Sequence, residues 1–187
     1  MAYTSALQTN KTLLDAGALL KKLPIHNGMK VADLGCGGAG HFVLPASSLV
    51  GDTGTVYAVD ILKSVLTGID SMARMRNIHN IHTLWSNLEH FEATALPNGF
   101  LDSAFLVNIL FLSTKHKEIL QETARMIKKG GSLLVIDWKD NNDIMGPPQP
   151  IRVSPQRIIN YTRGLDLELR EQLSAGKYHY ALIFEKQ

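Results

Sequence analysis

The sequence lacks the features that mark several classes of protein. It contains a single cysteine, Cys36, so no disulfide can form within the chain. Its 19 basic and 17 acidic residues give a net charge of +2, so we expect neither a nucleic-acid nor a membrane partner. No apolar run reaches membrane-spanning length, and the first ten residues lack the basic and apolar regions of a secretory signal. These absences favour a cytoplasmic protein.

The most informative stretch joins an apolar run to a glycine-rich run. Residues 31–34 are predicted to form a buried strand, and residues 35–40 let the chain turn sharply and approach a ligand, because glycine has no Cβ. A second predicted strand, 55–59, ends in Asp60. The carboxyl ends of neighbouring parallel strands meet at one edge of a sheet, where a carboxylate binds ribose hydroxyls. The sequence therefore predicts a nucleoside-containing cofactor at this edge.

The glycine spacing by itself favours NAD. Gly35, Gly37 and Gly40, followed by Asp60, satisfy the dinucleotide pattern. Asp33 argues against NAD, because a dinucleotide loop continues its apolar strand at that place and a buried charge needs a partner. The ammonium of an amino-acid moiety, or backbone N–H groups of the loop, would supply that partner. A chain of 187 residues also leaves no room for a separate substrate domain.

Four stretches resemble, in order and spacing, the motifs of class I S-adenosylmethionine-dependent methyltransferases. They are Val31–Gly37, Tyr57–Asp60, Leu101–Asn108 and Ile127–Asp137. The resemblance covers the chain from about residue 13 to residue 186 and is nearest to the small, insertion-free type related to ubiquinone and menaquinone biosynthesis. In one departure, Ala39 takes the third glycine position of the usual Gly-x-Gly-x-Gly loop.

The resemblance implies one methyltransferase domain over residues 1–187, with a Rossmann-like α/β fold. Its sheet would be seven-stranded and mostly parallel, with helices on both faces and an antiparallel C-terminal hairpin. We expect residues 1–9 to be flexible and residues 139–153, which are rich in proline, to form a loop over the site.

The apolar periodicity predicts the individual elements. We expect strands at 31–34, 55–59, 81–85, 101–106, 132–136, 165–173 and 178–184, and helices at 42–49, 64–75, 117–128 and 154–162, after a first helix that ends at Pro24. Thr12 and Asp15 are expected to form a capping box at the start of this first helix, and Gly130–Gly131 to cap helix 117–128.

By the same resemblance, the cofactor would be S-adenosylmethionine. Its methionine end would lie on the glycine loop, its ribose at the second strand, its adenine after the third strand and its methyl group near the fourth. The residues implied are Asp33, Gly35, Cys36, Gly37, Gly40, Asp60, Ile61, Asn87, Leu88 and Asn108. Asn87 stands where the family commonly has Asp, and it keeps a carbonyl acceptor for the adenine amine.

Methyl transfer from a sulfonium needs alignment and exclusion of water more than acid–base residues. Asn108, Asp137 and His41 are nonetheless candidates for a role at the reacting atoms, and Asp137 is preferred for a polar role because the end of its strand should open onto the cleft. Asp137, Asp140 and Asn141 also resemble the magnesium ligands of catechol-type methyltransferases. The carboxylate expected after the fourth strand is absent, so we expect no metal.

Several sequence signatures are missing, and their absence narrows the class of molecule that would accept the methyl group. The sequence Asn108–Phe111 is not Asn-Pro-Pro-Tyr, which argues against methylation of amino groups on nucleic-acid bases. One cysteine excludes the multi-cysteine arsenite enzymes and disfavours cytosine-C5 chemistry, and no glutamate pair marks a protein-arginine enzyme. A small, partly apolar molecule is the expected acceptor. Two alternatives stay open, a nicotinamide-dependent oxidoreductase and a non-catalytic cofactor-binding module, and the sequence does not identify the substrate, the accepting atom or the oligomeric state.

Overall fold

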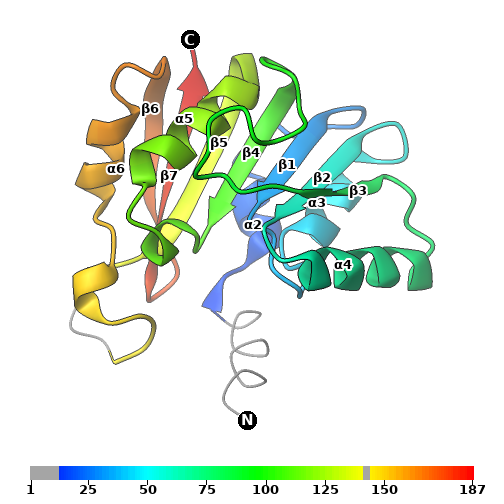
Figure 1. Cartoon of the computed structure of the whole chain (residues 1–187), viewed down its shortest axis with the longest axis horizontal. Coiled ribbons are helices and arrows are strands. Elements are labelled where there is room, and N and C mark those ends of the chain that lie inside the picture. Colours follow the sequence, from blue (N-terminus) through cyan, green and yellow to red (C-terminus); the bar gives the residue numbers. More distant parts are fainter. Residues whose placement is uncertain (1–12, 141–143) are drawn as a thin grey trace.

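A computed structural model of the chain describes residues 13–140 and 144–187 (Figure 1). Its strands form one seven-stranded sheet in the order β3-β2-β1-β4-β5-β7-β6. They are β1 (Lys30–Leu34), β2 (Thr55–Asp60), β3 (Ile81–Trp85), β4 (Leu101–Val107), β5 (Ile127–Trp138), β6 (Leu167–Ala175) and β7 (His179–Lys186). Strands β1 to β5 run parallel to one another, and β7 lies antiparallel between β5 and β6. The predicted fold class is confirmed.

Helices cover both faces of the sheet (Figure 1). They are α2 (Ala16–Leu20), α3 (Val43–Val50), α4 (Lys63–Met75), α5 (His116–Met126) and α6 (Pro155–Thr162), with two short 3-10 turns, η1 (Leu110–Leu112) and η2 (Gln149–Ile151). Helices α2, α3 and α4 pack on one face and α5 and α6 on the other. No helix in the described part of the chain is both long and apolar enough to cross a membrane.

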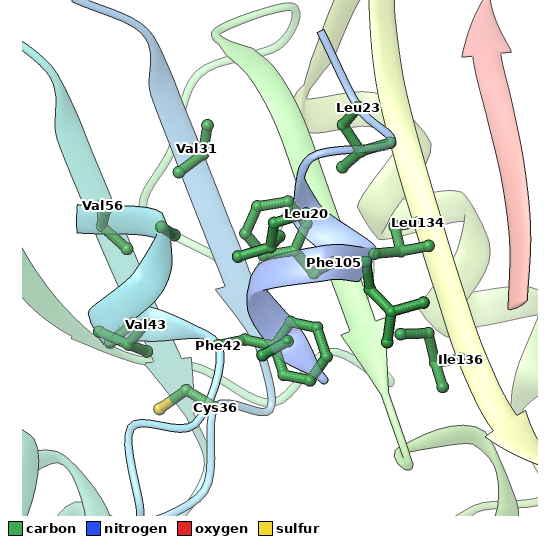
Figure 2. Close-up of a cluster of buried hydrophobic side chains, with 14 of the residues drawn as sticks. Leu20, Leu23, Val31, Cys36, Phe42, Val43, Val56, Phe105, Leu134 and Ile136 are labelled. Atoms are coloured by element: carbon green, nitrogen blue, oxygen red, sulfur yellow. The ribbon is translucent and has the colours of Figure 1, made fainter. Parts of the chain in front are cut away.

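The central strands are largely apolar because both of their faces are buried. In β4, Phe105 packs in the cluster under α2 and α3, while its neighbours Ala104 and Leu106 pack in the cluster under α5. Figure 2 shows the first cluster, in which Leu20 and Phe42 lie over this side of the sheet. The apolar runs that predicted buried strands therefore correspond to a sheet packed on both sides.

The predicted glycine cap after helix 117–128 is wrong. Helix α5 ends at Met126 and β5 begins at once with Ile127. The pairing of β5 with β4 shifts in register between Leu101 and Ser103, and Gly130 has a φ of 76°. A glycine with positive φ suits a bulge that absorbs extra residues on one strand. Gly130 and Gly131 therefore belong to a bulge in β5 and do not cap a helix.

The first helix is shorter than predicted. It covers Ala16–Leu20, and Asp15 is its N-cap residue, accepting a hydrogen bond from the Ala18 N–H at 2.9 Å. Leu23 remains buried although it follows the helix. Thr12, the proposed partner in the capping box, lies outside the described residues, as do residues 1–9.

The described residues of the segment 139–153 are irregular apart from η2, as predicted. Arg152 holds it together, because the buried guanidinium donates hydrogen bonds of 2.9 Å to the carbonyl oxygens of Lys139, Met145 and Pro147. One side chain thus satisfies backbone groups that no strand or helix pairs. Residues 141–143 of this segment lie outside the described part.

Candidate functional site

A cavity of about 560 Å³ lies at the carboxyl edge of the parallel strands. Segments that follow β1, β2, β3 and β4 line it. Strand β1 sits between β2 and β4, so the chain order reverses here, and open α/β sheets bind ligands at such a switch point. The cavity lining includes nine of the predicted cofactor residues: Asp33, Gly35, Cys36, Gly37, Asp60, Ile61, Asn87, Leu88 and Asn108.

The glycine loop is tied to the end of β2. The backbone N–H groups of Gly35 and Cys36 both donate to the Val59 carbonyl, at 2.7 and 3.0 Å. Gly35 has a φ of 81°, and a Cβ at this position would overlap the Ile109 side chain. A Cβ on Gly37 would meet nothing within 4 Å. The loop therefore packs against the segment after β4 at its first glycine and borders open space at its second.

Asp60 organises the loop as well as lining the cavity. Its Oδ2 accepts a hydrogen bond from the Gly37 N–H at 3.1 Å, and its Oδ1 accepts one from the Leu62 N–H at 2.9 Å. Each carboxylate oxygen keeps a further lone pair for a ligand hydroxyl. The prediction assigned this residue to ribose alone, and its bond to the glycine loop became visible only in the structure.

Asp33 is a buried carboxyl group that faces the cavity. It is 2% exposed, and no hydrogen bond reaches its carboxyl oxygens from the described residues. Burial, and then the negative charge of Asp60, raise the pKa of Asp33 to about 7. A cationic ligand group would stabilise the ionised form, because it replaces the solvation that burial removes.

Cys36 is a packing residue at the rim of the core. Figure 2 places it in the same cluster as Phe42 and Val43. Burial and the nearby carboxylates of Asp33 and Asp60 raise the pKa of the Cys36 thiol. The thiol therefore stays protonated, and a nucleophilic role is disfavoured.

Asn87 begins a turn after β3. Its Oδ1 accepts a hydrogen bond from the Glu89 N–H at 3.0 Å, which fixes the amide orientation and leaves one acceptor lone pair. Leu88 is buried and lines the cavity. The predicted adenine contact of these two residues stays a prediction.

Two of the three candidates for the reacting centre line the cavity. Asn108 follows β4 in a left-handed conformation with a φ of 55°, and its buried Oδ1 has no hydrogen-bond partner among the described residues. Nε2 of His41 lies 3.0 Å from the Leu14 carbonyl oxygen, which can only accept, so Nε2 donates this hydrogen bond.

Asp137, the third candidate, does not line the cavity. It is fully buried, and its Oδ1 accepts a hydrogen bond from the Trp138 N–H at 2.8 Å. Burial raises the pKa of Asp137 to about 7, although backbone N–H donors of Trp138, Phe111 and Leu110 oppose the rise. The end of β5 does not open onto the cleft as expected, because the η1 segment lies over it.

Gly40 also lies outside the cavity lining. It is buried, and a Cβ there would come within 2.9 Å of the Met72 Cε. With a φ of 59°, Gly40 permits close packing of the loop against α4. Gly40 therefore packs against α4, and its expected contact with the cofactor stays a prediction.

Two polar residues of the site, Glu89 and Ser113, were not predicted from the sequence. Both line the cavity, and the Ser113 Oγ donates a hydrogen bond of 2.6 Å to the Glu89 Oε1. This contact joins the segment after β3 to the segment after β4. The only signal in the sequence was that both polar residues follow predicted strands.

No group of three or more His, Cys, Asp or Glu residues in the described ranges lies close enough together to hold a metal ion. Asn141, one of the three residues that resemble magnesium ligands, lies outside those ranges. Asp137 and Asp140, the other two, therefore have no described third partner.

Comparisons with known proteins agree with this geometry. The ubiquinone/menaquinone biosynthesis C-methyltransferase of Haemophilus ducreyi is 34% identical over 119 residues, which are 61% of this chain and 43% of that protein. The corresponding enzyme of Blochmanniella floridana is 31% identical over 121 residues, 64% of this chain and 46% of that protein. The chain thus spans less than half the length of these curated relatives.

Solved structures share the fold. A SAM-dependent methyltransferase from Aquifex aeolicus superposes with a TM-score of 0.84 at 24% identity, covering 94% of this chain and 91% of that one. The geranyl diphosphate C-methyltransferase of Streptomyces coelicolor superposes with a TM-score of 0.75 at 13% identity, covering 92% and 78%. A family model described as a methyltransferase domain matches residues 25–160, and the chain belongs to that family.

Proposed function

We propose that this protein transfers a methyl group from S-adenosylmethionine to a small-molecule acceptor. The observation that carries the proposal is the cavity at the switch point of the sheet, where the glycine loop, Asp33 and Asp60 meet. The antiparallel β7 between β5 and β6 supports a methyltransferase over a dinucleotide-binding oxidoreductase, whose sheet would continue with parallel strands.

The residues of the cavity suit this cofactor. Asp33 offers a buried carboxyl group that no described residue bonds, which fits an ammonium group. Gly37 and Gly38 border open space, since a Cβ on either would meet nothing within 4 Å. Backbone at such a place approaches a ligand closely. A site for a charged, amino-acid-bearing nucleoside is therefore available along the loop.

Each part of the lining has a proposed task. Asp33 would bind the ammonium and the backbone of the glycine loop the carboxylate of the methionine end. Asp60 would accept the ribose hydroxyls with its remaining lone pairs, beside Ile61. Asn87 and Leu88 would flank the adenine, the amide accepting from its amine.

When bound, S-adenosylmethionine supplies a methyl group on a sulfonium, which a nucleophile takes in one displacement. The chain must then orient the acceptor and exclude water. Leu14, Phe42 and Ile109 provide apolar wall. Nδ1 of His41 would take a proton from the hydroxyl or amine of the molecule that is methylated. The Asn108 Oδ1, which no described residue bonds, would be a second polar contact for that molecule.

The acceptor class and the compartment are part of the proposal. The apolar share of the lining, with Leu112 exposed at its rim, supports a partly apolar acceptor. The lone buried thiol of Cys36 is compatible with work in the cytoplasm, where thiols stay reduced.

Calorimetric titration with S-adenosylhomocysteine, with NADH alongside, tests the proposal. We expect micromolar binding of the first and none of the second. Asp60→Asn, which removes a carboxylate lone pair and the charge, should weaken binding at least tenfold, whereas the exposed-turn control Asp52→Asn should not. NADH binding would support an oxidoreductase. Binding of S-adenosylhomocysteine without turnover on any acceptor would support a non-catalytic module.

A further inference from the structure

The part of the cavity lining left for the acceptor carries one ionised group. Once the glycine loop and the ends of β2 and β3 are assigned to the cofactor, the polar side chains that remain are His41, Glu89, Asn108 and Ser113. The rest of this part is apolar and includes Leu14 and Leu112.

Glu89 is held in place across the cavity. The Ser113 Oγ donates to its Oε1 at 2.6 Å, and its backbone N–H donates to the Asn87 Oδ1 at 3.0 Å. The hydrogen bond from Ser113, together with the charge of Lys115, lowers the pKa of Glu89, so the carboxylate is ionised at neutral pH. The side chain is 34% exposed and therefore partly shielded from water.

The cation that pairs with this carboxylate lies outside the cavity lining. Lys115 forms an ion pair with the Glu89 Oε2 at 3.5 Å, and the Lys115 side chain is 47% exposed. Among described residues no lysine or arginine belongs to the lining, whereas Asp33, Asp60 and Glu89 do. S-adenosylmethionine brings a single net positive charge to a lining that holds several carboxylates. The cavity therefore stays negative with the cofactor bound.

Building on the proposed function, we propose that the acceptor carries no anionic group and that Glu89 is the residue that excludes anions. The acceptor is a neutral or cationic, largely apolar small molecule. A carboxylate or phosphate on it would meet the Glu89 charge in a partly desolvated site, where like charges repel more strongly than in water. No cation of the described lining would pair with such an anion.

A matched set of probes tests this inference by calorimetry in the presence of saturating S-adenosylhomocysteine. The probes are 2-naphthylmethanol, 2-naphthylmethylamine and 2-naphthoate, which share one ring system and differ in charge. We expect the alcohol and the amine to bind and the carboxylate to bind at least tenfold more weakly. Glu89→Gln should narrow this gap and Glu89→Lys should reverse it. Glu118→Gln, which removes an exposed carboxylate outside the cavity, should leave the gap unchanged.

The outcomes separate the two proposals. If S-adenosylhomocysteine itself fails to bind, the proposed function is wrong. If it binds and 2-naphthoate then binds as tightly as the alcohol, the exclusion of anions is wrong while the cofactor assignment stands. A gap that persists unchanged in Glu89→Lys would refute the role of Glu89. Failure of all three probes to bind beside the cofactor product would refute an apolar acceptor site.

Discussion

Replacing Asp137 by asparagine should make the protein more stable at neutral and alkaline pH. The side chain is fully buried, and burial raises its pKa from 3.8 to about 7 although the backbone N–H groups of Trp138, Phe111 and Leu110 oppose the rise. A carboxyl group with a raised pKa binds its proton more tightly in the folded state. Its contribution to stability is therefore complete below about pH 4 and is lost as the pH rises to about 7.

The size of the effect follows from the shift. Each pKa unit corresponds to about 1.4 kcal/mol, so ionisation of Asp137 lowers the free energy of unfolding by about 4 kcal/mol above pH 7. Asparagine has nearly the same shape, keeps one oxygen for the Trp138 N–H and does not ionise. The two proteins should have similar stability near pH 4, and Asp137→Asn should be the more stable by about 4 kcal/mol at pH 8.

Urea unfolding at pH 4.5, 6 and 8, followed by tryptophan fluorescence, measures the difference directly. Asp33, whose pKa is also raised, is present in both proteins and cancels. Asp52→Asn, in an exposed turn, is the control and should show no pH-dependent gap. A gap that stays constant between pH 4.5 and 8, or a variant that is less stable at pH 8, would refute the reasoning. Affinity for S-adenosylhomocysteine should be unchanged, because Asp137 does not line the cavity.

Two further predictions concern the core and the glycine loop. Glu122→Ala should lower the free energy of unfolding by about 3–5 kcal/mol in urea titrations at pH 7, because it leaves the buried guanidinium of Arg125, 2.8 Å away, without its partner. Hydrogen bonds from Arg125 and from backbone N–H groups lower the pKa of Glu122 to about 2, so this contribution is lost as the pH falls from about 4.5 to about 2, and the gap between the two proteins should close over that range. Gly35→Ala should weaken S-adenosylhomocysteine binding at least tenfold in calorimetry, since the new methyl group would overlap Ile109. Gly68→Ala, with no atom within 4 Å of its Cβ, is the matched control. Equal affinities of the two variants would contradict the placement of the loop.

The order of the elements and the place where the glycine loop meets Asp60 could be predicted from the sequence because both depend on local patterns. Apolar runs marked β1 to β4 to within one residue at each end, since strands buried on both faces are largely apolar, whereas β5 begins five residues before its predicted start. The glycine loop and Asp60 follow strands directly, so predicting the strands also predicted where these residues would meet.

Contacts between distant segments could not be predicted in this way. The burial of Asp137 depends on the η1 segment after another strand, and Gly130–Gly131 serve a bulge that exists only in the register of β5 against β4. Neither the burial of Asp137 nor the bulge leaves a periodic pattern in the sequence, because each depends on a segment that is distant along the chain.

The hydrophobic pattern and the conformations that glycine allows predicted an α/β sheet and the edge of it at which a ligand would bind, and the resemblance of four motifs indicated the family. The side chains that face the cavity, and their states of charge, depend on how distant segments pack. The tertiary structure joined Glu89 to Ser113, turned Asp60 toward the glycine loop and closed Asp137 off from the cavity. Burial and hydrogen bonding set pKa values and orientation, and both arise only when remote segments pack together.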